Sequence, residues 1–222
     1  MDSKEFIAEI NRKIGERSIL KHPFYQDWKS GRLTRKMLQI YAKQYYIHVV
    51  AFPRYLSNIH SKITDFKDRT LILQNLMDEE YGNKNHPGLW LQFCEALGLS
   101  KDEVGKTLPA KETSQFVNHF LNAGNKGIPQ GIAALYTYEY QIPKVSHEKI
   151  KGLINFYSVD KEGLEYFKVH EQADIEHSRA EMELLLKHTK PQEAKEVFKI
   201  VDKTLDAYWN MLSGIRQLCL QA

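Results

Sequence analysis

The chain has 222 residues, with 31 Lys and Arg against 28 Asp and Glu, a formal net charge of +3. The basic residues are scattered along the sequence, which argues against nucleic-acid binding. The first fifteen residues are polar and charged, and no stretch approaches the roughly 20 apolar residues that span a bilayer. We expect one domain over residues 1–222, a cytoplasmic location with secretion left open, and no membrane association.

Helical spacing recurs in almost every segment, and no Asn-Gly or Asp-Gly turn joins alternating runs. This pattern predicts an all-α bundle of seven or eight helices. Helix starts are expected at Thr34, at Ser100 with Glu103 as a capping box, at Asp160 and at Pro191. Breakers cluster in residues 81–88 and 122–131, and Pro53 and Pro143 should each kink or interrupt a helical pattern.

The segment "FKVHEQADIEHSRAEM" carries His170, Asp174 and His177 at intervals of four and three. On a helix advancing about 100° per residue, these side chains share one narrow stripe. Phe167 and Leu184 continue the stripe, which indicates that it faces inward. Buried imidazoles and carboxylates need partners or a metal ion. A solvated helix face remains the alternative from this segment alone.

Three further candidates lie upstream. Glu79 and His86 are seven residues apart in "NLMDEEYGNKNHPGLW", although glycine and proline argue against a continuous helix between them. A solvated charge for Glu79 and a turn partner for His86 are the ordinary alternatives. Glu139 lies in the apolar and aromatic run "GIAALYTYEYQIPKV", where a metal or another cation would keep it charged.

Together these residues form a set of three carboxylates and three imidazoles. Mixed oxygen and nitrogen ligands suit iron or manganese better than a structural zinc. Helical bundles hold dinuclear sites with such ligands, although the usual pair of Glu-x-x-His motifs is missing. Six ligands would hold two ions and leave positions for dioxygen. Glu181 shares the stripe of His177, and we expect it one turn beyond the ligands.

Five segments resemble the haem-oxygenase-like dimetal oxidases, and within them the group around the chlamydial protein associating with death domains. They are "HPFYQDW", "YAKQYYIHVVAFPRYLSNIHS", "NLMDEEYGNKNHPGLW", "GIAALYTYEYQIPKVSHEKIKGL" and "HEQADIEHSRAE". The resemblance runs from about residue 20 to residue 187. It implies a haem-oxygenase/TenA-like bundle with two metal ions, Fe/Fe or Mn/Fe, and dioxygen and a reductant as co-substrates.

Residue by residue, the resemblance places the family's metal ligands at Glu79, His86, Glu139, His170, Asp174 and His177. It implies para-aminobenzoate formation for folate biosynthesis, with the protein's own tyrosine, Tyr25, consumed and Lys149 as the amino donor. Tyr41 and Tyr138 match tyrosines of the family and would line the pocket. Without the resemblance, Tyr25 reads as a core aromatic residue and Lys149 as one of many surface lysines.

Two other functions compete with this one. A TenA-like thiamin-salvage hydrolase would use a cysteine nucleophile in a metal-free pocket, and Cys94 and Cys219 lie outside the five segments, among apolar residues. Without a CxxC motif, these two cysteines favour a reducing compartment. The related cofactorless pyrroloquinoline quinone oxidases would not need the six ligands. A non-enzymatic protein that binds a host death-domain protein follows from the resemblance alone. The sequence leaves open whether the chain forms a homodimer.

Overall fold

Eleven α-helices make up most of residues 2–221, the part of the chain that this computed structural model describes. They are α1 (Ser3–Glu16), α2 (Pro23–Lys29), α3 (Arg35–His60), α4 (Phe66–Glu80), α5 (His86–Ala96), α6 (Lys101–Gly105), α7 (Lys111–Lys126), α8 (Ile128–Glu139), α9 (Ile142–Phe156), α10 (Glu165–His188) and α11 (Ala194–Leu220). Short 3₁₀ turns cover Ile19–Lys21, Glu162–Leu164 and Pro191–Glu193, and these residues contain no strand.

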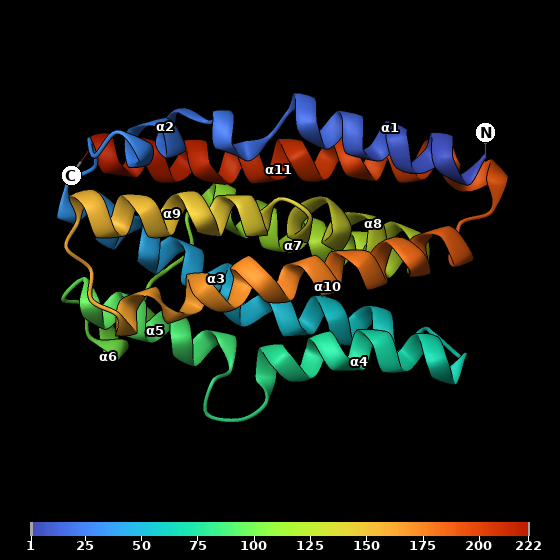
Figure 1. Ribbon diagram of the computed structural model, residues 1–222, viewed down its shortest axis with the longest axis horizontal. Coiled ribbons are helices and arrows are strands. Elements are labelled where there is room, and N and C mark those ends of the chain that lie inside the picture. Colours follow the sequence, from blue (N-terminus) through green and yellow to red (C-terminus); the bar gives the residue numbers. More distant parts are fainter. Residues whose placement is uncertain (1, 222) are drawn as a thin grey trace.

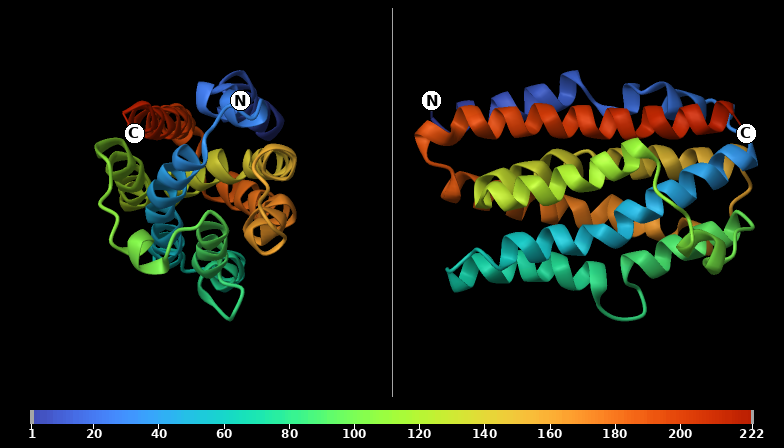
Figure 2. Two further views of the ribbon diagram at one scale, coloured as in Figure 1. Left: turned by 90° about the vertical axis from the view of Figure 1, so that its left-hand side faces the viewer. Right: turned by 180° about the vertical axis from the view of Figure 1, so that it is seen from behind.

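The long helices lie roughly along one axis (Figure 1). α10 packs mainly on α8 and α9, while α3 contacts α4, α5, α7 and α11. α1 and α2 lie along α11, and α4 with α5 covers the opposite side of the bundle, as the end-on view in Figure 2 also shows. The all-α prediction is confirmed. The helix count exceeds seven or eight because α2 and α6 are short and α8 and α9 are separate helices.

The predicted helix starts follow from local hydrogen bonds. Thr34 accepts from the backbone of Met37, and Ser100 and Glu103 form a reciprocal capping box. Asp160 accepts from the backbone N–H of Gly163, 2.9 Å away, and one 3₁₀ turn then leads into α10. Pro191 likewise opens a 3₁₀ turn before α11.

The two internal prolines act differently. α3 runs through Pro53 without ending. Around Pro143, α8 ends at Glu139 and α9 begins at Ile142, with Pro143 in the first turn of α9, where a missing N–H costs no helix hydrogen bond. Glu139 therefore lies at a helix end, beside the interruption that the sequence predicts.

Buried apolar and aromatic side chains fill the space between the helices, with large rings such as Trp28, Trp90 and Phe167 almost inaccessible. Within residues 2–221, no helix is both long and apolar enough to cross a lipid bilayer. The polar residues buried in this core are concentrated where α4, α5, α8 and α10 meet.

Candidate metal centre

Four helices bring the six predicted ligands together. Every one of these side chains is buried, with at most 8% of its surface exposed. They form two groups, in each of which the ligand atoms lie within 4.8 Å of one another. The first triad is Glu79 from α4, His86 from α5 and His170 from α10; the second triad is Glu139 from α8 with Asp174 and His177 from α10. The inward orientation predicted for the α10 stripe is thus confirmed.

The loop between α4 and α5 explains how Glu79 and His86 meet without a continuous helix. Gly82 has φ +78°, a left-handed conformation that most residues adopt only at a cost in energy. Asn85 then caps α5 by accepting from the backbone of Gly88 at 2.9 Å, which makes His86 the first residue of the new helix. His86 Nδ1 consequently lies 2.8 Å from Glu79 Oε1.

Both triads border one small cavity with a free volume of about 10 Å³. Glu79 and His170 reach it from the first triad, and Glu139 and Asp174 reach it from the second. The rest of its wall is His48, Val49, Phe52, Tyr138 and Tyr166. This space holds about one water-sized molecule. Of the two tyrosines predicted to line the pocket, Tyr138 belongs to this wall and Tyr41 does not.

Hydrogen bonds fix the orientation of two imidazoles. His170 Nδ1 lies 2.7 Å from the carbonyl oxygen of Tyr166, so Nδ1 carries the proton and Nε2 keeps its lone pair. His177 Nε2 lies 3.0 Å from Oδ2 of Asp78, an exposed carboxylate. Nδ1 of His177 is then the nitrogen that faces Glu139 and Asp174, at 3.7 and 3.4 Å. Metal-bound histidines are held in this way.

Among the described residues, Asp174 Oδ2 has no hydrogen-bond partner. The contacts of His86 Nδ1 with Glu79 at 2.8 Å and of His177 Nδ1 with Asp174 at 3.4 Å lack hydrogen-bond geometry. Unpaired buried polar atoms cost free energy, about 1–3 kcal/mol each, and a bound ion would satisfy them. The first triad offers two imidazoles and one carboxylate, and the second offers one imidazole and two carboxylates. Such a mixture of nitrogen and oxygen donors suits iron or manganese. The residues therefore fit a site for two metal ions.

The carboxylates make the electrostatic potential at the second triad strongly negative. Burial alone would lower the pKa of His177, but Asp174 and Glu139 outweigh burial and raise it to about 11. Burial, together with Glu139 and Glu79, raises the pKa of Asp174 to about 7 despite the opposing effect of His177. A proton at His177 is held by the same carboxylates that would attract a divalent cation, so metal binding would displace it.

Glu181 lies beside this triad but outside it. Its carboxyl group is 1% exposed, lies within hydrogen-bonding reach of Glu139, and receives no hydrogen bond from a described donor. Burial and the neighbouring Glu139 raise its pKa well above the usual value. Glu139 itself has a lowered pKa, because Glu181, His177 and Asn75 outweigh its burial. The exclusion of Glu181 from the ligands stays a prediction.

Lys149 and Tyr25 lie together in an aromatic cluster next to the centre. Lys149, on α9, is 3% exposed, and its Nζ lies 5.3 Å from the ring centroids of Tyr25 and Tyr41 and 4.9 Å from that of Tyr45. Burial lowers the pKa of Lys149 to about 7. Tyr25, on α2, is 1% exposed. The reading of Lys149 as a surface lysine is therefore wrong, because α9 turns it into the core.

Several residues of this region were not predicted from the sequence, among them Asn75, His48 and Tyr208. Asn75 donates to Glu139 at 3.1 and 3.3 Å, His48 lines the cavity, and Tyr208 of α11 lies 3.3 Å from the hydroxyl of Tyr25. Each is a polar residue on a mostly apolar helix face, a signal that its polar atoms need buried partners. The sequence does not say which partners.

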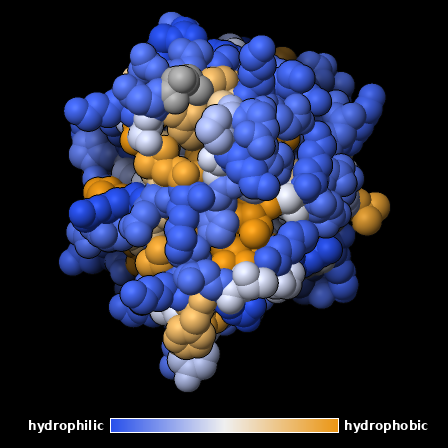
Figure 3. Space-filling view, turned by 90° about the vertical axis from the view of Figure 1, so that its right-hand side faces the viewer, coloured by the Kyte–Doolittle hydropathy of each residue, from blue (hydrophilic) through white to orange (hydrophobic). Residues whose placement is uncertain are grey.

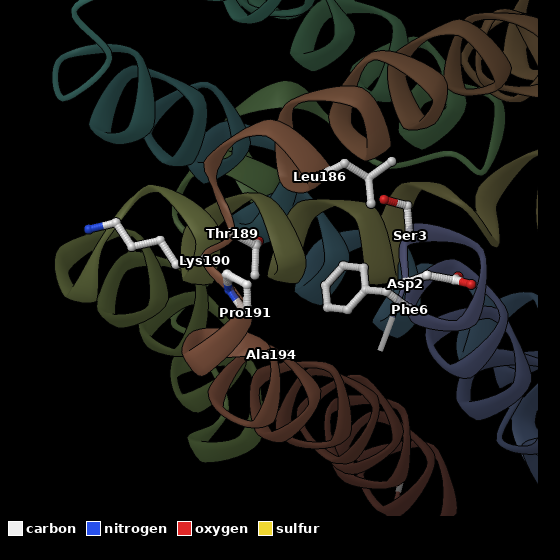
Figure 4. Close-up of a pocket in the computed structure, with 8 residues that line it drawn as sticks. All are labelled: Asp2, Ser3, Phe6, Leu186, Thr189, Lys190, Pro191 and Ala194. Carbon is white, nitrogen blue, oxygen red and sulfur yellow. The ribbon is translucent and has the colours of Figure 1, made fainter.

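Other features of the structure do not join this centre. A surface pocket of about 160 Å³ lies between α1 and the α10–α11 connection, lined by Asp2, Ser3, Phe6, Leu186, Thr189, Lys190, Pro191 and Ala194 (Figure 4). Figure 3 views the end of the bundle on the right-hand side of Figure 1, where apolar patches interrupt a largely hydrophilic surface. None of the predicted site residues lines the pocket.

The cysteines do not support the thiamin-salvage alternative. Cys94 and Cys219 are free and buried, and burial raises their pKa values to about 12 and about 11. A cysteine nucleophile needs a lowered pKa and access to its substrate.

The fold and the site define a class of protein: an all-α bundle with two buried triads of histidines and carboxylates. Residues 9–215 match the TENA/THI-4/PQQC family, and the chain belongs to this family. The 4-aminobenzoate synthase of Chlamydia pneumoniae is 42% identical over 212 residues, 94% of each chain. The 4-aminobenzoate synthase of Nitrosomonas europaea is 37% identical and covers 98% of this chain and 93% of its own.

Solved structures confirm the haem-oxygenase/TenA-like fold. A TenA homologue from Pseudomonas syringae superposes with a TM-score of 0.81 at 16% identity, covering 98% of this chain and 96% of its own. A domain of unknown function with a haem-oxygenase-like fold from Shewanella denitrificans gives a TM-score of 0.76 at 17% identity, covering 98% of this chain and 93% of its own. The homodimer, the death-domain partner and the cytoplasmic location stay predictions.

Proposed function

We propose that this chain is a dimetal, dioxygen-dependent oxidase that forms para-aminobenzoate for folate biosynthesis, with Tyr25 as the source of the aromatic ring and Lys149 as the amino donor. The observation that carries the proposal is the position of two buried triads on one cavity, beside a cluster that holds Tyr25 against Lys149. Relatives named 4-aminobenzoate synthase that match nearly the whole chain support the product.

The six ligands would hold an Fe/Fe or Mn/Fe pair. When bound, the pair supplies activation of dioxygen, with electrons from an external reductant. The protein's own contribution is to keep water out and to position the reacting groups. Tyr166 holds the His170 ring in one tautomer, and Asp78 does the same for His177. The cavity of about 10 Å³ admits a molecule no larger than water or dioxygen.

The cluster prepares Tyr25 and Lys149 for a reaction with each other. An amine acts as a nucleophile only in its neutral form, and the burial that lowers the pKa of Lys149 to about 7 supplies that form near neutral pH. The Lys149 Nζ lies 5.3 Å from the Tyr25 ring centroid, so a small side-chain movement brings nitrogen to carbon. Trp28 Nε1 donates to the Lys149 carbonyl at 3.3 Å and fixes this part of α9.

Isotope labelling tests the proposal directly. The protein would be produced with ring-labelled tyrosine and side-chain nitrogen-labelled lysine, then loaded anaerobically with iron, with and without manganese. After addition of dioxygen and a reductant, mass spectrometry should find para-aminobenzoate carrying both labels, at no more than one molecule per chain, and mass changes at Tyr25 and Lys149. Unlabelled product would contradict the self-sacrifice of Tyr25, and product with a labelled ring but unlabelled nitrogen would contradict the role of Lys149.

Two variants complete the test. Tyr25→Phe should bind metal normally and release no para-aminobenzoate. Tyr136→Phe is the matched control, because Tyr136 is a buried tyrosine whose hydroxyl bonds to Asn11 at 2.8 Å, outside the cluster. It should react like the unaltered protein. Unchanged yield from Tyr25→Phe would refute the assignment of Tyr25.

A further inference from the structure

Four buried tyrosines form a chain of hydroxyl groups from Tyr25 to the cavity. Tyr208 Oη lies 3.3 Å from Tyr25 Oη and 3.5 Å from Tyr45 Oη. The hydroxyl of Tyr45 in turn hydrogen-bonds to that of Tyr138, which lines the cavity. The four residues come from α2, α11, α3 and α8, and each is at most 4% exposed. Tyr25, which does not line the cavity, is thereby connected to it.

Tyr208 has a position that Tyr41 lacks. Tyr41 Oη lies 3.5 Å from Tyr25 Oη, and this is the hydrogen bond that its hydroxyl forms within residues 2–221. Tyr208, by contrast, bonds on both sides, and its ring centroid also lies 5.3 Å from that of Tyr138. A hydrogen-bonded route from Tyr25 through Tyr208 therefore continues to the cavity. The route from Tyr25 to Tyr41 stops at Tyr41.

The chemistry of a buried phenol requires such a route. Burial raises the pKa values of Tyr25 and Tyr45 well above their usual value and that of Tyr208 to about 12, so these three stay protonated at neutral pH. If Tyr25 loses an electron, the positive charge that remains is costly in a low-dielectric core. The proton must leave with the electron, and Tyr208 and Tyr41 are the described groups within hydrogen-bonding distance of Tyr25 Oη.

We propose that Tyr208 and Tyr45 relay the electron and the proton of Tyr25 toward the metal centre. Tyr25 loses one hydrogen atom, as a proton and an electron, and becomes a neutral phenoxyl radical. Each relay phenol passes its own hydroxyl hydrogen toward the cavity and receives one from the neighbour behind it, so it ends unchanged. Through Tyr138, the proton and the electron reach dioxygen, the oxidant, which is reduced. This inference rests on the proposed function.

Single substitutions in the loaded protein test the relay. Tyr208→Phe and Tyr45→Phe each remove one hydroxyl, and Tyr136→Phe removes a buried hydroxyl outside the chain. After mixing with dioxygen, loss of Tyr25 is followed by peptide mass spectrometry and radicals by freeze-quench electron paramagnetic resonance. We expect Tyr25 to disappear at least tenfold more slowly in both relay variants, with unchanged metal content. A radical on the cavity side of the substitution should live longer, because it no longer receives the hydrogen of Tyr25. Tyr136→Phe should behave like the unaltered protein.

Unchanged loss of Tyr25 in Tyr208→Phe would overturn the relay, as would an equal slowing in Tyr136→Phe. If Tyr208→Phe lost metal or unfolded, fluorinated tyrosines at position 208 would decide, because they keep the hydroxyl and the shape while changing acidity and redox potential. The rate should then vary with fluorine content, and a constant rate would overturn the proposal.

A metal-free measurement checks the geometry. With 3-fluorotyrosine at position 25, the ¹⁹F resonance should shift in Tyr208→Phe and stay in place in Tyr136→Phe. No shift in Tyr208→Phe would contradict the hydrogen bond.

Failure of the relay and failure of the proposed function remain distinguishable. A radical whose decay depends on Tyr208, without para-aminobenzoate, would contradict the function alone. Para-aminobenzoate released at an unchanged rate by Tyr208→Phe would contradict the relay alone.

Discussion

Replacement of Lys149 by methionine should stabilise the metal-free protein by an amount that depends on pH. Lys149 is buried against four aromatic rings, and burial lowers its pKa from 10.5 to about 7. Between these values the unfolded chain binds one proton more than the folded chain, so the free energy of unfolding rises with pH by about 1.4 kcal/mol per unit. Over this window the shift corresponds to up to about 5 kcal/mol.

Lys149→Met removes this titration while keeping an unbranched apolar stem. The variant should be more stable than the unaltered protein by up to about 5 kcal/mol near pH 7, and the difference should shrink toward zero near pH 10. Urea denaturation between these pH values measures it. Lys151→Met is the matched control, since Lys151 is exposed on the same helix, and it should give no comparable trend. A stability difference that stays constant with pH would refute the buried, neutral lysine.

Three further outcomes are expected. Glu181→Gln should raise the free energy of unfolding of the metal-free protein at pH 8 by about 1 kcal/mol, because an amide can donate to Glu139 without charge. Two ions per chain should still bind to this variant. Loss of one ion would show that Glu181 is a ligand. His170→Ala should remove one ion per chain by elemental analysis, and full loading would contradict the first triad. Gly152→Ala should cost about 1–3 kcal/mol in urea denaturation, because the added Cβ would lie 2.6 Å from Trp28 Cδ1; unchanged stability would contradict this packing.

The part of the site that lies on one helix could be predicted from the sequence. His170, Asp174 and His177 belong to α10, and helix geometry fixes their relative directions whatever the rest of the chain does. Apolar neighbours such as Phe167 and Leu184 then indicated which way the stripe faces, and the structure buries it. The same local rules predicted the helix starts at Thr34 and Ser100.

Contacts between distant segments could not be predicted in this way. The seven-residue spacing of Glu79 and His86 would place them on one face only of a continuous helix. They meet instead across a loop that contains Gly82, and helical spacing could not predict the path of that loop. Tyr208 and Tyr25 are 183 residues apart, and their hydroxyls meet because α11 packs beside α2. A tyrosine on an apolar helix face indicates only that its hydroxyl needs a partner.

The charges of the core link metal loading to the state of Lys149. In the metal-free protein, Asp174 and Glu139 raise the pKa of His177 to about 11, so a proton at His177 supplies part of the positive charge that metal ions would bring. Two divalent ions would displace that proton, and binding should therefore strengthen as pH rises. Lys149 is close enough that its charge lowers the pKa of His170, and by reciprocity positive charge at the first triad disfavours a charged Lys149. Loading the metals thus favours the neutral amine that the proposed reaction needs, beside the tyrosine it would consume.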